Sequence, residues 1–132
     1  MATYQVWNQW GGLKAPWHKD GVWMMGGRHN QFLSYVKMQA PDNGFIMNGE
    51  LAYEGEQKIN CRAEEVGWNK WAVQVEINGS WQLDGVWVMG DRYPQRITQI
   101  DVTAEGDHTL LGTTTYTHEG PIGFKGVLYQ NL

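Results

Sequence analysis

Several features are scarce in this sequence of 132 residues, and each scarcity excludes a class of protein. Cys61 is the sole cysteine, so no internal disulfide can form, which suits a reducing compartment. The formal net charge is −4 and no basic stripe is present to contact phosphates, so nucleic acid is not an expected partner. No apolar run approaches the roughly 18 residues that a membrane-spanning helix requires.

Targeting and metal-binding patterns are missing as well. The first ten residues, MATYQVWNQW, have neither the basic nor the apolar region of a secretion signal. We therefore expect a cytoplasmic protein, with release or non-classical export left open. No run of Lys and Arg predicts attraction to an anionic membrane. The four histidines form no closely spaced ligand pair, so we expect neither a metal nor a cofactor.

Glycine and tryptophan, by contrast, are abundant, with 17 Gly and eight Trp. Glycine at this level is typical of a turn-rich β protein or of a low-complexity chain, and the mixed composition excludes the second. We expect most of the tryptophans to lie in the core.

The chain also repeats itself. DGVWMMGGR at residues 20–28 returns as DGVWVMGDR at residues 84–92 with seven identities, and Gln31 matches Gln95 further on. Two copies are too few for a solenoid, so two halves that close one structure are the better interpretation. We expect a single domain of residues 1–132, with repeat 1 at about residues 1–66 and repeat 2 at about residues 67–132.

The hydrophobic pattern within each repeat has the period of β-strands. Val36 and Met38 alternate with Lys37 and Gln39, and the same alternation recurs at residues 98–103. Further strands are expected at residues 4–7, 22–25, 47–53 and 59–63, with turns at Pro41–Gly44 and Glu105–Asp107. About five short strands per half, with no helical stripe, predict an all-β protein that closes into a barrel and so removes its exposed edges.

Three motifs occur in a recognisable order: NQWGG with APW at residues 8–17, GVWMMGGR at 21–28 and YTHEGPIGFKG at 116–126. Over essentially its whole length the chain resembles the Oscillatoria agardhii agglutinin family of lectins. The resemblance implies a compact ten-stranded antiparallel β-barrel that binds high-mannose N-glycans, notably their branched mannose core. It also implies possible antiviral and agglutinating activity, glycoproteins as partners, and a monomer or weak homodimer.

The resemblance further implies that each site is shared between the halves, with a Trp-Gly loop of one half meeting an Arg loop and a Glu-Gly loop of the other. One complete set is present: Trp10, Gly11, Arg92, Glu119 and Gly120. The chemistry suits a sugar, because an indole offers a platform for the apolar face of a pyranose and Arg and Glu bond its hydroxyls. Glycines let the backbone approach closely.

The corresponding second set, Arg28, Glu56 and Gln57, departs from this pattern in both of its parts. Where the first half runs VWNQWGGLKAPW, the second runs VQVEINGSW and has no QWGG. Gln57 stands where the pattern has glycine, and Lys58 where it has proline. Because both losses belong to one expected site, we predict one intact and one degenerate site. Both arginines survive, which leaves a partly structural role open, such as anchoring a loop.

For several other residues we expect a structural role, in packing or in a turn, and not a role in binding. Trp23 and Trp87, like Trp17 and Trp81, recur in both halves, so we expect all four to pack in the core or at the barrel ends. For Trp10 a core role remains the alternative to binding. Cys61 is expected to be a small core residue and not a nucleophile, and the sequon NGS at residues 78–80 to be a turn.

Two rival classes of function remain. Glu56 and Glu119 are related by the repeat, but at opposite barrel ends they would lie beyond the roughly 5–10 Å that a glycosidase pair requires. No Ser/His/Asp arrangement is evident, so we predict no enzyme activity. The other rival is a protein-interaction module of the same fold that has lost or changed glycan specificity and uses Trp10 as an anchor.

Overall fold

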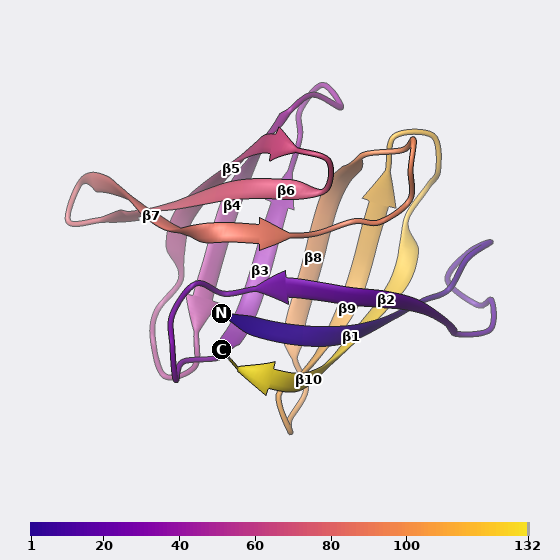
Figure 1. Cartoon of the computed structure of the whole chain (residues 1–132), viewed down its shortest axis with the longest axis horizontal. Coiled ribbons are helices and arrows are strands. Elements are labelled where there is room, and N and C mark those ends of the chain that lie inside the picture. Colours follow the sequence, from indigo (N-terminus) through magenta and orange to yellow (C-terminus); the bar gives the residue numbers. More distant parts are fainter. Residues whose placement is uncertain (132) are drawn as a thin grey trace.

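The alternation of buried and exposed residues produces ten strands in the computed structural model, which describes residues 1–131 and has no helix within them (Figure 1). The strands are β1 (Ala2–Asn8), β2 (His18–Met25), β3 (Leu33–Gln39), β4 (Ile46–Tyr53), β5 (Ile59–Gly67), β6 (Lys70–Ile77), β7 (Ser80–Val88), β8 (Ile97–Ala104), β9 (Thr109–Tyr116) and β10 (Ile122–Asn131). The predicted turns at Pro41–Gly44 and Glu105–Asp107 lie between strands, as expected.

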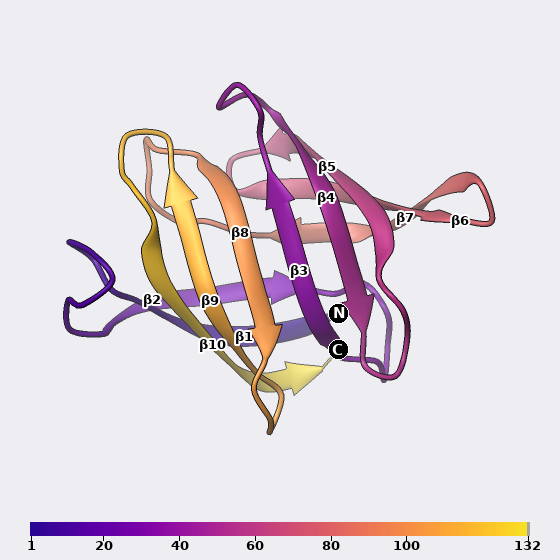
Figure 2. The ribbon, with the colours of Figure 1, turned by 180° about the vertical axis from the view of Figure 1, so that it is seen from behind.

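The strands close into one antiparallel barrel in the order β1-β10-β9-β8-β3-β4-β5-β6-β7-β2. Each half contributes five strands, and its leading hairpin pairs with the last strand of the other half: β1 with β10, and β6 with β5. The middle strands β3 and β8 pair directly, as the rear view shows (Figure 2). The predicted all-β, ten-stranded antiparallel barrel is therefore confirmed.

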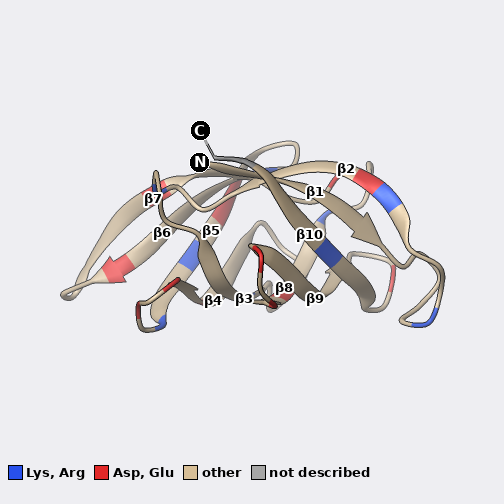
Figure 3. Cartoon of the chain, turned by 90° about the horizontal axis from the view of Figure 1, so that it is seen from below, with Lys and Arg blue, Asp and Glu red and all other residues tan. Residues whose placement is uncertain are grey.

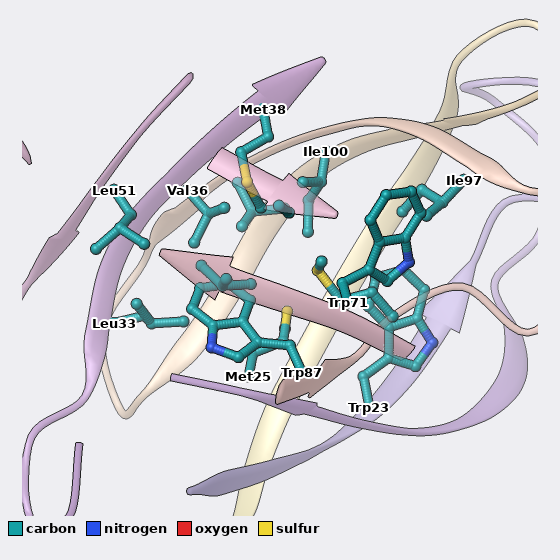
Figure 4. Close-up of a cluster of buried hydrophobic side chains, with 14 of the residues drawn as sticks. Trp23, Met25, Leu33, Val36, Met38, Leu51, Trp71, Trp87, Ile97 and Ile100 are labelled. Atoms are coloured by element: carbon teal, nitrogen blue, oxygen red, sulfur yellow. The ribbon is translucent and has the colours of Figure 1, made fainter. Parts of the chain in front are cut away.

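The core is built around tryptophan. Trp23, Trp71 and Trp87 are at most 1% exposed and lie among aliphatic and methionine side chains from both halves (Figure 4). Large aromatic side chains dominate the energetics of such cores because each buries a large apolar area. The core positions expected for Trp23 and Trp87 are confirmed. Cys61 is also buried, and burial raises the pKa of its thiol to about 12, as suits a core residue.

Of the two positions expected for Trp17 and Trp81, core or barrel end, the core position is wrong, since these side chains are 42% and 37% exposed. Each instead lies beside a cation from across an intervening strand. Arg62 Cζ on β5 is 4.1 Å from the Trp81 ring centroid on β7, and Lys125 Nζ on β10 is 5.6 Å from that of Trp17, which directly precedes β2. Arg62 and Lys125 also correspond in the repeat. The repeated tryptophans thus reflect a repeated cation–aromatic contact on the surface and not burial.

Acidic and basic residues are spread over the strands and loops, and Figure 3 shows no basic stripe on the face it presents. Within residues 1–131 there is also no helix long and apolar enough to cross a membrane.

Candidate functional site

The pairing of β1 with β10 places the loop between β1 and β2 beside the loop between β9 and β10. Asn8 is opposite Phe124, and immediately after it the Gln9 amide donates to the Gly123 carbonyl at 3.0 Å. The Gln9 side chain donates from Nε2 to the Ala15 carbonyl at 2.9 Å, which closes the loop on itself. A Cβ at Gly123 would lie 1.8 Å from Gln9 Oε1, so any side chain here would displace the Gln9 side chain from the position in which it bonds Ala15.

A charged cluster joins the loop between β7 and β8 to the loop between β9 and β10. Arg92 donates from Nε to Glu119 Oε2 at 2.7 Å and from Nη2 to Oε1 at 3.3 Å, a bidentate arrangement. Gln95 donates from Nε2 to the same Oε2 at 2.9 Å, and its Oε1 accepts from the His118 amide at 3.2 Å. Three side chains from two loops are therefore held in fixed orientations.

Trp10 is stacked into this cluster. The Arg92 guanidinium carbon lies 3.8 Å from the centroid of the Trp10 ring, and the Tyr116 ring lies 5.7 Å away at an angle of 42°. Trp10 is half-buried and packs against the edge of the core, so part of its ring has the core role that the sequence left as the alternative to binding and part remains accessible. The stack fixes the indole before any ligand arrives, which lowers the ordering cost of binding.

Beside the stack lies a hollow of about 330 Å³. Its lining consists of Gly11, Gly12, Glu119, Gly120, Pro121 and Ile122. Gly11 has φ 98°, a left-handed conformation that side chains rarely adopt, and a Cβ at Gly120 would meet no atom within 4 Å. All five residues of the predicted intact set thus come together, three by direct contact and two as part of the lining.

At the other end of the barrel, Arg28 and Glu56 form an equivalent pair with Nη1 at 2.7 Å from Oε1 and 2.8 Å from Oε2. Gln31 donates from Nε2 to Glu56 Oε2 at 2.6 Å, and the hydrogen bonds from Arg28 and Gln31 lower the pKa of Glu56. No indole is available there, and the Arg28 guanidinium lies 4.3 Å from the Tyr53 ring centroid. Gln57 is exposed.

The missing indole follows from the length of the hairpin loop. Residues 9–17 connect β1 to β2, but only Asn78 and Gly79 connect β6 to β7, with φ of 52° and 82°. These angles suit the tight two-residue hairpin turn, so the turn expected from NGS is confirmed. Asn60 occupies the position of Gly123 and donates from Nδ2 to Glu76 Oε1 at 3.1 Å. A side chain therefore stands at the position where, at the first end, the Gln9 side chain packs against glycine.

A partly buried acidic group, Asp20, lies beneath the Trp10 end. Burial raises the pKa of Asp20 to about 6, with repulsion from Asp91 adding and attraction to Arg92 opposing. Asp20 Oδ2 has no hydrogen-bond partner among the described residues. Its counterpart is Asp84, whose Oδ2 accepts from the Gly27 amide, the Tyr53 hydroxyl and Trp87 Nε1. The two ends thus differ below the surface as well.

Sequence reasoning missed the two glutamines as members of these clusters. Gln31 and Gln95 match in the repeat, and that match is the signal that could have identified them. Gly12, Pro121 and Ile122 were also not anticipated as lining residues.

A second hollow, of about 320 Å³, lies over β4, β5 and β6 and contains none of the expected site residues. Arg62, in its lining, is engaged by Gln74 Oε1 at 2.7 Å and by the Trp81 ring. Within residues 1–131, no group of three His, Cys, Asp or Glu side chains is placed to hold a metal ion.

Comparison with known proteins identifies relatives of the whole chain. The family model described as the OAA-family lectin sugar binding domain matches residues 2–66 and again residues 69–129. Lectin OAA of Planktothrix agardhii is 41% identical over 129 residues, which are 95% of this chain and 98% of that protein. Lectin ESA-2 of Eucheuma serra is 43% identical over 95% of this chain and 48% of its own length.

A solved structure is also similar to this chain over nearly its whole length. The crystal structure of the Myxococcus xanthus hemagglutinin in complex with α3,α6-mannopentaose has a TM-score of 0.90 and 38% identity over 96% of this chain and 49% of that chain. This chain therefore spans about half the length of the Eucheuma and Myxococcus proteins and nearly all of the Planktothrix protein.

Proposed function

This chain belongs to the OAA family of lectins, and from that premise we propose that it binds the branched mannose core of high-mannose N-glycans through one site. The site consists of Trp10, Gly11, Arg92, Glu119 and Gly120. The mannopentaose complex of the Myxococcus xanthus relative supports a mannose-type ligand.

One observation carries the proposal: the Trp10 ring, the Arg92 guanidinium and the Glu119 carboxylate meet beside a hollow lined by glycine. The indole provides an apolar platform for the C–H face of a pyranose. Glu119 accepts from sugar hydroxyls with the lone pairs that Arg92 and Gln95 leave free, and Arg92 retains unused N–H donors. The glycines leave room for the sugar to approach the backbone.

The second set, Arg28, Glu56 and Gln57, lacks this platform and is proposed to be degenerate. Its Arg–Glu pair remains intact, but no described aromatic side chain corresponds to Trp10, because only two residues connect β6 to β7. A monomer with one site would bind glycoproteins without crosslinking them, because agglutination requires at least two sites per particle.

Catalysis is not proposed. The loops that carry Glu56 and Glu119 lie at opposite ends of the barrel (Figure 1), and the two carboxylates are each neutralised by their own arginine. A paired acid and base on one sugar bond would need to be close neighbours.

A glycoprotein pull-down separates this function from a protein-interaction module. Immobilised protein should retain a glycoprotein that carries high-mannose glycans and lose it after enzymatic removal of those glycans. Trp10→Ala protein serves as the matched control and should retain neither form. Retention that survives deglycosylation would overturn the lectin function in favour of protein recognition.

A further inference from the structure

An exposed aromatic pair flanks the Trp10 end of the barrel. Tyr93 is 79% exposed, the largest value among the large hydrophobic side chains described, and Trp68 is 38% exposed. Their ring centroids are 5.0 Å apart and the rings are nearly perpendicular, at 77°. Exposed aromatic rings are costly in water and frequently mark binding sites.

The pair is attached directly to the candidate site. Tyr93 follows Arg92 in a turn that is closed by the Gln95 amide, which donates to the Arg92 carbonyl at 2.7 Å. Arg92 and Gln95, at the two ends of this turn, both donate to Glu119, and these bonds hold Tyr93 in place between them. Arg92 faces the β1–β2 loop through Trp10, and Tyr93 faces the β5–β6 turn through Trp68.

Trp68 is positioned as firmly as Tyr93. It is the first residue of the two-residue turn between β5 and β6, and the second, Asn69, accepts at its carbonyl from the Met89 amide at 2.9 Å. This bond ties the β5–β6 turn to the start of the loop that carries Arg92 and Tyr93. An edge-to-face pair also leaves the faces of one ring free of its partner, as a platform for a ligand requires.

The pair accompanies only the end that carries the indole. At the other end His29 stands at the position of Tyr93 in the repeat, and it makes no ring contact among those found within residues 1–131. The Trp68–Tyr93 pair therefore lies beside the intact set of site residues, whereas the ring contact near the degenerate set is a different one, between Phe32 and His108.

We propose that Trp68 and Tyr93 form an accessory subsite for a further pyranose of the same glycan, beyond the residues held at Trp10, Arg92 and Glu119. This inference rests on the proposed function. A sugar is favoured over a protein partner because two rings offer far less area than the roughly 1,200 Å² that a stable protein interface buries. The neighbouring Arg92 and Gln95 also supply polar groups suited to hydroxyls.

The test compares two glycans on three proteins by calorimetric titration: the branched mannopentaose and a nine-mannose high-mannose glycan, against wild type, Trp68→Ala and Tyr93→Ala. We expect the pentaose affinity to be unchanged, and the affinity for the larger glycan to fall by about five- to tenfold in each variant, the effect of one aromatic contact. Tyr129→Ala is the matched control, because Tyr129 is 58% exposed on β10 and should leave both affinities unchanged.

A direct readout complements the titration. The Trp68 indole N–H resonance, assigned by its absence in Trp68→Phe, should shift on addition of the larger glycan and not of the pentaose. Unchanged affinities in both variants, or equal losses for both glycans, would overturn the subsite while leaving the proposed function standing. If wild type binds neither glycan, the proposed function fails and the subsite with it.

Discussion

The two ends of the barrel share an Arg–Gln–Glu cluster and differ in what surrounds it. At one end Arg92 lies under the Trp10 ring, and at the other Arg28 lies on Tyr53 with no indole beside it. The polar cluster is thus present whether or not a platform for a ligand exists. At both ends the cluster joins two loops, and in the proposed function recognition depends on what the hairpin loop adds.

The three differences at the second end all fall within the one site expected there. The hairpin loop is cut to Asn78 and Gly79, Asn60 fills the place of Gly123, and Gln57 replaces the glycine that lines the hollow at the first end. All three differences concern the same hairpin loop, its support or the lining beside it, because a side chain in place of Gly123 would displace the Gln9 side chain that closes the longer loop.

The largest effect is expected at Trp10 and Arg92. Trp10→Ala removes the platform and Arg92→Ala removes a charged donor, and a lost charged hydrogen bond costs about 1.5–3 kcal/mol, or roughly 10- to 150-fold in affinity. Titration with the mannopentaose should detect no binding by either variant. Arg28→Ala should bind as wild type does, and an equal loss in Arg28→Ala would contradict the difference between the two ends.

Transferring one feature from the second end to the first should have the next largest effect. Gly123→Asn places a Cβ where Gln9 Oε1 now lies, so the Gln9 side chain must leave its bond to Ala15 and the loop that carries Trp10 loses this closure. We expect binding weakened by about tenfold or more, equivalent to about 1.4 kcal/mol. The reverse change, Asn60→Gly, is the control and should leave binding unaltered. Wild-type affinity in Gly123→Asn would show that the loop tolerates the side chain.

The buried carboxylate at the first end predicts a pH dependence of stability. The pKa of Asp20 is raised to about 6 in the folded protein, so the folded state holds its proton more tightly than the unfolded chain. The free energy of unfolding should therefore fall as pH rises from about 4 to about 7, by about 1–3 kcal/mol from this group. Denaturant titrations of wild type and Asp20→Asn across this range check it. An identical pH dependence in both proteins would exclude Asp20 as the cause.

The smallest effect is expected from the cluster at the second end. Arg28→Ala and Glu56→Ala break a partly exposed ion pair, so the free energy of unfolding should fall by about 1 kcal/mol or less. Denaturant unfolding of the single and double variants measures the coupling between them. A coupling of several kcal/mol would mean that the cluster stabilises the barrel far more than an exposed pair does.

Much of the fold could be predicted from the sequence because period-2 alternation and the internal repeat are local signals. The five residues of the intact set were predicted through family resemblance, and the structure brings them together. Exposure of Trp17 and Trp81 could not be predicted, because a repeated tryptophan looks the same whether it packs in a core or beside a cation on the barrel surface. The same holds for Gly123, whose importance appears only when Gln9 is placed against it.

The stoichiometry of glycan binding tests the central claim most directly. Calorimetric titration of wild-type protein with the branched mannopentaose should give one glycan per chain, bound at the Trp10 end alone. Two glycans per chain would contradict the account, because the Arg28 end would then bind without an indole. A titration without heat, repeated with the larger glycan and again silent, would contradict the lectin function itself.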